Sequence, residues 1–188
     1  KVTAPAGHKS LRVALTGLKG GHSGLDIVKN HMNANHALAR VLQSGAGEIP
    51  HELASFDGGS KRNAIPREAF ATVYVEAGHE GAFREGLEKA AAALRVQWAG
   101  NDEGLTVTVS DADEAPGEVF APGEAMRLVR FLRGIPSGVI AMSQDIEGLV
   151  ETSTNLGVVT TTPDAVEVIS CTRSSVAEAL RGTLDQLQ

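Results

Sequence analysis

A histidine inside a glycine-dense turn is the strongest chemical feature of the sequence. Residues 17–24 read Gly-Leu-Lys-Gly-Gly-His-Ser-Gly, so four glycines surround His22 just before a predicted helix. Glycines let a backbone approach a ligand closely, and the imidazole of His22 could donate a hydrogen bond or exchange a proton. On local grounds alone, the simplest interpretation is a structural turn in which Ser23 caps the helix. A phosphate cradle is the other alternative, but its pattern needs Lys and then Ser or Thr after the last glycine.

The sequence predicts no metal site in this chain. Metal binding needs several His, Cys, Asp or Glu side chains converging on one point. His31 and His36 stand five residues apart, which turns them about 140° from each other on a helix, whereas a metal-binding helical pair stands four apart. Cys171 lies in an apolar strand and is most simply a small core residue. His22 is therefore a histidine without the rest of an active site.

Apolar spacing predicts a chain of mixed α/β structure. Leu11, Val13 and Leu15 alternate with more polar residues, as a half-buried strand requires, and apolar residues then recur at helical spacing from Leu25 to Leu42. Before residue 111, further patterns predict strands at 51–56, 67–76 and 104–110 and a helix at 81–99. An acidic connector follows at 111–117. After it, the patterns predict a helix at 122–132, a long loop, strands at 150–160 and 165–172, and a final helix from 176.

The order of these elements repeats. We predict an α/β fold of the α+β type, with two pseudo-repeated βαββαβ-like halves at about 8–111 and 112–188. A mainly antiparallel sheet would be covered on one face by helices. Residues 105–109 would serve as the opening strand of the second unit, and its closing strand would lie just beyond residue 188 of a parent chain.

Composition excludes several classes of protein. The 188 residues are 42% hydrophobic and 21% charged, with a net charge of −6, which lacks the basic field of a nucleic-acid binder. No apolar stretch approaches the roughly 20 residues of a membrane-spanning helix. A single cysteine and no signal-peptide core predict a cytoplasmic protein. We therefore expect small-molecule or protein partners, and neither nucleic acid nor membrane.

Several ordered motifs resemble the lid of aminoacyl-histidine dipeptidases, the peptidase D or carnosinase-like group of zinc metallopeptidases. After residues 17–24, the matching segments are Asn-Ala-Asn-His-Ala-Leu-Ala-Arg at 33–40, Ser-Phe-Asp-Gly-Gly-Ser-Lys-Arg-Asn-Ala-Ile-Pro at 55–66, Glu-Thr-Ser-Thr-Asn-Leu-Gly-Val at 151–158 and Cys-Thr-Arg-Ser-Ser at 171–175. The resemblance implies that residues 1–188 are a lid domain. The catalytic domain, with its two divalent metal ions, expected to be zinc, is absent from this sequence. The parent would hydrolyse Xaa-His dipeptides, and this chain alone would be inactive.

The resemblance also implies roles for individual residues. His22 would donate a hydrogen bond to the scissile carbonyl as it becomes an oxyanion, with Asn63 as a second polar contact to the substrate. Arg173, in the second half, would bind the terminal carboxylate of the substrate through its planar guanidinium. Asn155 and Thr154 would line the same cleft or form a strand-end turn. In two-chain relatives the neighbouring subunit supplies His and Asn, and here one of the two repeated halves could replace that neighbour.

A different class of function stays open on the sequence. The chain could be a dimerisation or small-molecule-binding module without a catalytic role, since exposed sheet edges associate readily. The catalytic interpretation implies a dipeptide substrate, the catalytic domain of the same protein and a second copy as partners. The combination of His22, Asn63 and Arg173 favours it, because a pure association module needs none of these side chains together.

Overall fold

The computed structural model describes residues 1–47, 49–114 and 116–187. Among them, seven strands form one antiparallel sheet in the order β11-β10-β4-β6-β2-β7, with β9 also paired to β10. The bounds are β2 (His8–Thr16), β4 (His51–Gly58), β6 (Ala69–Glu76), β7 (Thr106–Asp111), β9 (Gly138–Met142), β10 (Val150–Thr161) and β11 (Val166–Ser174). Two short ladders lie outside this sheet: β1 (Val2–Thr3) pairs with β8 (Glu118–Val119), and β3 (Gly21–His22) pairs with β5 (Ala64–Ile65).

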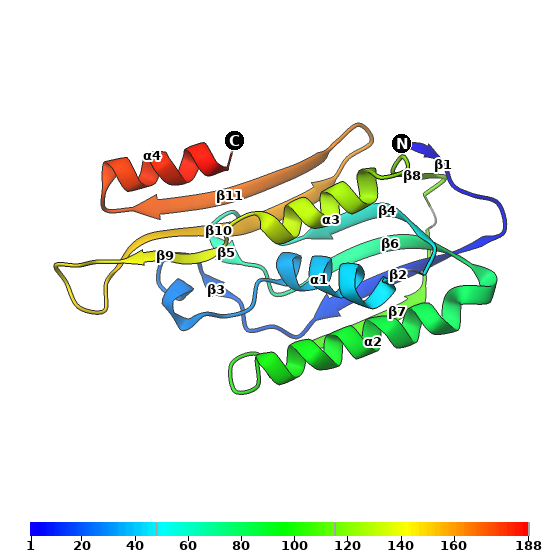
Figure 1. The fold of residues 1–188 in the computed structure, drawn as a ribbon, viewed down its shortest axis with the longest axis horizontal. Coiled ribbons are helices and arrows are strands. Elements are labelled where there is room, and N and C mark those ends of the chain that lie inside the picture. The colour runs from blue at the N-terminus through cyan, green and yellow to red at the C-terminus, as the bar shows by residue number, and fades with distance from the viewer. Residues whose placement is uncertain (48, 115, 188) are drawn as a thin grey trace.

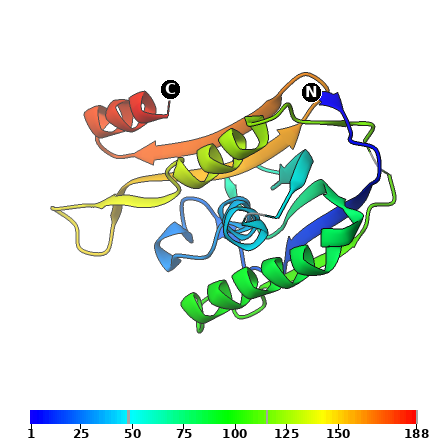
Figure 2. The same ribbon diagram turned by 45° about the vertical axis from the view of Figure 1, so that its right-hand side comes forward.

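The helices α1 (Ala34–Ala46), α2 (Glu80–Gln97) and α3 (Glu124–Gly134) lie side by side across one face of the sheet (Figures 1 and 2). The helix α4 (Ala177–Gln186) packs beside β11, and two 3-10 turns, η1 (Ile27–Lys29) and η2 (Ala77–His79), precede α1 and α2. Leu11, Val13 and Leu15, which alternate along β2, are fully buried in the core under the helices. Leu38, Phe56 and Phe83 are fully buried in the same core. Burial of these apolar surfaces is the main term that holds the layers together.

The predicted α/β fold with a mainly antiparallel sheet is confirmed. In the first half, β2, α1, β4, β6, α2 and β7 follow one another in βαββαβ order. The predicted place of the strand at 105–109 is wrong, however. β7 pairs with β2 along its whole length, from Leu11 opposite Asp111 to Thr16 opposite Thr106, so it closes the first half instead of opening the second.

Two further details of the secondary structure differ from the sequence prediction. The helix expected from Leu25 begins only at Ala34, where the Asn33 side chain accepts hydrogen bonds from the backbone N–H groups of the first turn. Leu25 is 77% exposed, so its helical spacing reflects no buried face. The predicted long loop before residue 150 contains β9, whose side chains stay largely exposed because it forms an outer edge next to β10.

Candidate functional site

The β3–β5 ladder brings two distant motifs together. His22 lies opposite Ala64 in this ladder, and the backbone N–H of Ser23 donates to the carbonyl of Asn63 at 2.9 Å. The glycine turn therefore lies against the Asn-Ala-Ile-Pro loop, although about 40 residues separate them in the chain. His22 and Asn63 therefore lie at neighbouring positions of the backbone.

Hydrogen bonds decide which nitrogen of His22 can act as a donor. Its Nδ1 accepts from two backbone N–H groups, those of Gly24 and Leu25, each at 3.1 Å. A ring nitrogen that accepts hydrogen bonds carries no hydrogen, so the neutral imidazole must carry its hydrogen on Nε2. The turn thus fixes the ring and leaves Nε2–H as the group that can donate to a ligand.

Arg173 reaches the same point from the second half of the chain. It lies on β11 opposite Ser153, and its side chain is exposed. A methyl group placed on Gly24 would lie 3.2 Å from Cε1 of His22 and 3.4 Å from Nε of Arg173. Ring atoms of His22 and the Nε of Arg173 therefore both lie beside the same side of Gly24. The two side chains come from opposite halves of the molecule.

Asn155 supports this site from inside the protein. It is 1% exposed, and its Nδ2 donates to the carbonyls of Ala64 at 2.8 Å and Arg62 at 3.2 Å, on either side of Asn63. Its amide nitrogen is thus engaged by backbone rather than open to a cleft. Thr154 is equally buried, and its hydroxyl shares a hydrogen bond with the Thr172 hydroxyl. Asn155 holds the Asn63 loop, and Thr154 belongs to the pairing of β10 with β11.

Asp26 holds the backbone of His22 in place, a contact that the sequence analysis missed. Its carboxylate accepts the backbone N–H of His22 at 2.7 Å and forms an ion pair with Lys29 at 2.7 Å. The pairing with Lys29 and the hydrogen bond from His22 hold the pKa of Asp26 below its usual value, so this acceptor stays ionised. Gly21, at φ 140°, has no room for a side chain beside Asp26. A short-range signal existed, because Asp26 stands four residues after His22.

Asp102, which the sequence analysis also missed, binds both ends of the segment that carries His22. Asp102 is 1% exposed and lies between α2 and β7; its carboxylate accepts from the backbone N–H groups of Lys19 at 2.8 Å and Met32 at 2.6 Å. The neighbouring Asn101 donates to the carbonyls of Lys29 and Asn30. One turn therefore binds both ends of the 19–32 segment. Sequence patterns carry no signal for such a contact, since the partners are about 70 to 80 residues away.

Among residues 1–47, 49–114 and 116–187, the side chains that could bind a metal ion do not gather at one point. In the parts of the chain that the structure describes, no group of three or more His, Cys, Asp or Glu side chains converges. His31 instead bonds to the Gly20 carbonyl through Nδ1, and His36 is largely buried beside α3. The site built around His22 is one of hydrogen-bond donors and positive charge.

None of the described helices is long and apolar enough to cross a membrane.

Comparison with known proteins agrees with this architecture. Residues 13–101 match the family described as "Peptidase dimerisation domain". The cytosol non-specific dipeptidase of Escherichia coli (strain K12) is 37% identical over 172 residues, which cover 92% of this chain and 35% of that protein. The crystal structure of the aminoacylhistidine dipeptidase from Vibrio alginolyticus superposes with a TM-score of 0.93 at 36% identity, covering 99% of this chain and 38% of that one. The chain thus spans little more than a third of the length of these relatives.

Proposed function

Residues 13–101 belong to the peptidase dimerisation domain family, and the chain is similar to the dipeptidases named above; from that premise we propose that it is the lid of a metal-dependent dipeptidase. The substrate would be a short peptide ending in histidine. The observation that carries the proposal is the meeting of His22 and Arg173 at Gly24. A domain with only a structural role has no reason to place a donor and a cation, from two halves of the fold, beside the same partly buried glycine.

His22 would act on the carbonyl of the scissile bond. Its Nε2–H donates to the carbonyl oxygen, and the hydrogen bond strengthens as that oxygen gains negative charge in the transition state. Because the Gly24 and Leu25 N–H groups already fix the ring, little reorganisation is needed when the substrate arrives. Preorganised donors of this kind typically contribute about 10²–10³ in turnover.

Arg173 and Asn63 would hold the rest of the dipeptide. The guanidinium of Arg173 offers paired N–H groups that match the geometry of a terminal carboxylate. Asn63, exposed on the loop held by Asn155, adds a polar contact beside His22. The first half, at about 8–111, supplies the donors, and the second half, at about 112–188, supplies the cation. One half of the chain would thus take the place that a neighbouring subunit has in two-chain relatives.

The metal ions of this proposed enzyme, two divalent ions expected to be zinc, would be bound outside this chain. Their ordinary contribution to peptide hydrolysis is a polarised carbonyl and an activated water. The residues described above would orient the dipeptide, donate to its carbonyl and exclude solvent as the lid closes. Without the catalytic domain, the chain should have no peptidase activity. A cytoplasmic location accords with the name of the E. coli relative.

The test uses the whole enzyme that carries this lid, with His22→Ala as the main variant. We expect kcat for an Xaa-His dipeptide to fall about 10²–10³-fold while the bound metal content stays unchanged. His79→Ala is the matched control, because His79 follows the far end of β6 from the site. Arg173→Lys keeps the charge but loses the bidentate fork, so it should mainly raise KM. A kcat that is the same for His22→Ala and His79→Ala would rule out the catalytic role.

A dimerisation module is the second candidate function, favoured by the description of the matched family. In that case the domain would join two copies of the enzyme, and neither His22→Ala nor Arg173→Lys would change turnover. Sedimentation of the whole enzyme with and without residues 1–188 would measure this role directly. The two functions are compatible, since a lid can both cover a site and contact a second copy.

A further inference from the structure

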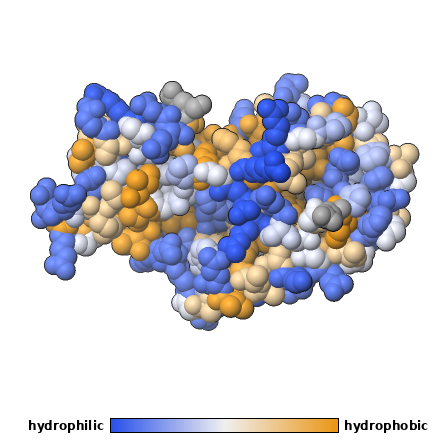
Figure 3. Space-filling view, in the orientation of Figure 1, coloured by the Kyte–Doolittle hydropathy of each residue, from blue (hydrophilic) through white to orange (hydrophobic). Residues whose placement is uncertain are grey.

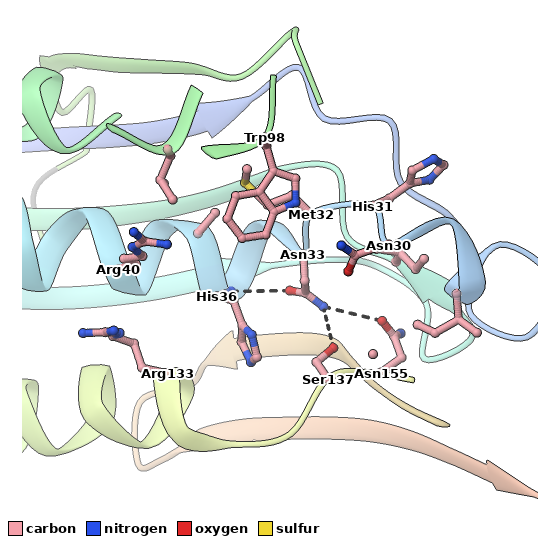
Figure 4. A pocket seen from close by; sticks show the side chains of 15 residues that line it. Asn30, His31, Met32, Asn33, His36, Arg40, Trp98, Arg133, Ser137 and Asn155 are labelled. Atoms are coloured by element: carbon pink, nitrogen blue, oxygen red, sulfur yellow. Dashed lines mark hydrogen bonds between the residues drawn. The ribbon is translucent and has the colours of Figure 1, made fainter. Parts of the chain in front are cut away.

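A cavity of about 210 Å³ lies between α1 and α3 on the helical side of the molecule. Figure 4 shows its walls: His36 and Arg40 come from α1, Arg133 from the end of α3, and Trp98 from the residue after α2. Asn33, Ser137 and Asn155 line the opposite end. The volume is below the roughly 300–1,000 Å³ of sites for drug-sized ligands, so the cavity suits a small molecule.

The walls of this cavity carry positive charge without a balancing carboxylate. Arg40 donates to the Gln97 side chain and Arg133 to the Gln43 side chain, each at 2.6 Å, and both partners are neutral. Among the described residues no Asp or Glu lines the cavity or forms a salt bridge with either arginine. Each guanidinium keeps further N–H donors free. Two cations without a carboxylate partner among the described residues are notable at one cavity of a chain whose net charge is −6.

His36 also lines the cavity. Within the described part of the chain, its Nε2 has no hydrogen-bond partner, but this atom has almost no exposed surface. The ring therefore contributes to the cavity wall through its other atoms. In Figure 4 the His36 ring points toward α3, between Arg133 and Ser137.

The remaining wall is apolar and aromatic. Trp98 and Leu94 face the cavity from the end of α2, with Ala37 and Met32 beside them. A flat indole ring favours contact with another planar group through offset or edge-to-face packing. The cavity therefore combines donors and positive charge at one end with a surface for a planar apolar group.

We propose that this cavity is a binding site for a small organic anion, a carboxylate attached to a planar apolar group. Arg40 and Arg133 would bind the carboxylate, and Trp98 would pack against the planar part. The cavity shares Asn155 with the support of the His22 site, but neither His22 nor Arg173 lines it, and its ligand need not be a substrate. The proposal does not depend on the proposed dipeptidase function.

Fluorescence titration with benzoate tests the proposal on this chain, because Trp98 is its only tryptophan. We expect a saturable change in emission. Arg40→Gln and Arg133→Gln should each weaken binding about tenfold, which corresponds to the loss of one charge-assisted hydrogen bond. Benzamide, which has the same shape without the charge, should bind at least about tenfold more weakly than benzoate. Calorimetry repeats each comparison without relying on Trp98.

Arg130→Gln is the matched control, since it removes the same charge from α3 but does not line the cavity. It should bind benzoate like the unchanged chain. Thermal unfolding of every variant checks that the fold is intact. Equal binding of benzamide and benzoate, equal effects of Arg130→Gln and Arg133→Gln, or the lack of a saturable response to benzoate would each overturn the proposal.

Discussion

At the scale of single residues, the chemistry proposed for His22 depends on atoms that other residues hold in place. Backbone N–H groups occupy Nδ1, Asp26 binds the backbone N–H of His22, and Asp102 binds both ends of the surrounding segment. These supports are ionic or backbone groups with little freedom to move. A donor fixed in this way loses little entropy when it binds a developing oxyanion, which is the physical basis of preorganised electrostatic catalysis.

His36 should make the stability of the chain depend on pH. Burial, with Arg133 nearby, lowers the pKa of His36 below its usual 6.5. Between the folded pKa and 6.5, the unfolded state therefore binds more protons than the folded state. The free energy of unfolding rises as the pH rises through this window, and it decreases as the pH falls through the window. One proton limits the slope to about 1.4 kcal/mol per pH unit.

Urea unfolding between pH 5 and 7.5 measures this effect. His36→Gln should flatten the slope relative to the unchanged chain, whereas His79→Gln, at an exposed histidine paired with Glu76, should leave the His36 contribution in place. A slope that His36→Gln does not reduce would contradict the assignment. The lowered carboxyl pKa values of Glu80 and Asp111 act at lower pH and lie outside this window.

At the scale of elements, two glycines set the distance between α1 and α2. A methyl group on Gly45 would lie 2.7 Å from the Gly86 carbonyl oxygen and 2.8 Å from Cα of Leu87. Glycine inside a helix is unfavourable by about 0.5–1 kcal/mol relative to alanine, so its presence at a crossing accords with close backbone contact. The position of α1 matters for the site, since Asn33 at its N-terminus bonds to the Leu156 carbonyl and contacts Asn155.

Gly45→Ala should therefore destabilise the protein by about 1–3 kcal/mol, because the helices must move apart and α1 must shift on the sheet. Gly182→Ala in α4 is the opposite case, as nothing lies within 4 Å of an added methyl group there. That change should stabilise by about 0.5–1 kcal/mol through helix propensity alone. Urea unfolding of both variants provides the comparison, and a neutral or stabilising Gly45→Ala would show that the crossing can relax.

At the scale of the whole molecule, the two halves form one structure around a shared core. Within the described residues, β4 and β10 pair through a single residue pair, Val159 opposite Gly58. Side chains strengthen the junction: the Thr161 hydroxyl donates to the Phe56 carbonyl at 3.0 Å and accepts from its N–H at 2.8 Å. Leu156 and Val159 of β10 are buried in the same core as the first-half strands. We therefore expect the halves to unfold together.

Thr161→Val tests the junction with a side chain of nearly the same shape. Loss of both hydrogen bonds leaves the Phe56 N–H unsatisfied, so the chain should lose about 1–3 kcal/mol of stability. Thr160→Val, on the exposed side of the same strand, should change stability by less than about 0.5 kcal/mol. Trp98 fluorescence reports the first half and circular dichroism the whole chain. Coincident transitions would support shared unfolding, and separate ones would contradict it.

The sequence by itself determined the parts of this protein that depend on local pattern. The alternation of Leu11, Val13 and Leu15 predicted β2, helical spacing predicted α2, α3 and α4 to within a few residues, and the ordered motifs indicated the family. The glycine turn pointed to His22. These features follow from the periods of helix and strand and from the freedom of glycine, which act along the chain.

Only the tertiary structure decided which distant groups meet. The pairing of β7 with β2, the engagement of Asn155 with the Asn63 loop and the binding of the 19–32 segment by Asp102 all join residues far apart in sequence. The late start of α1 has the same origin, because the exposed Leu25 has no packing partner to extend the helix toward it. The whole fold must bury its apolar surface and also give every buried backbone group a hydrogen-bond partner. These two requirements set the strand order and the buried polar contacts, and no local pattern of residues contains that information.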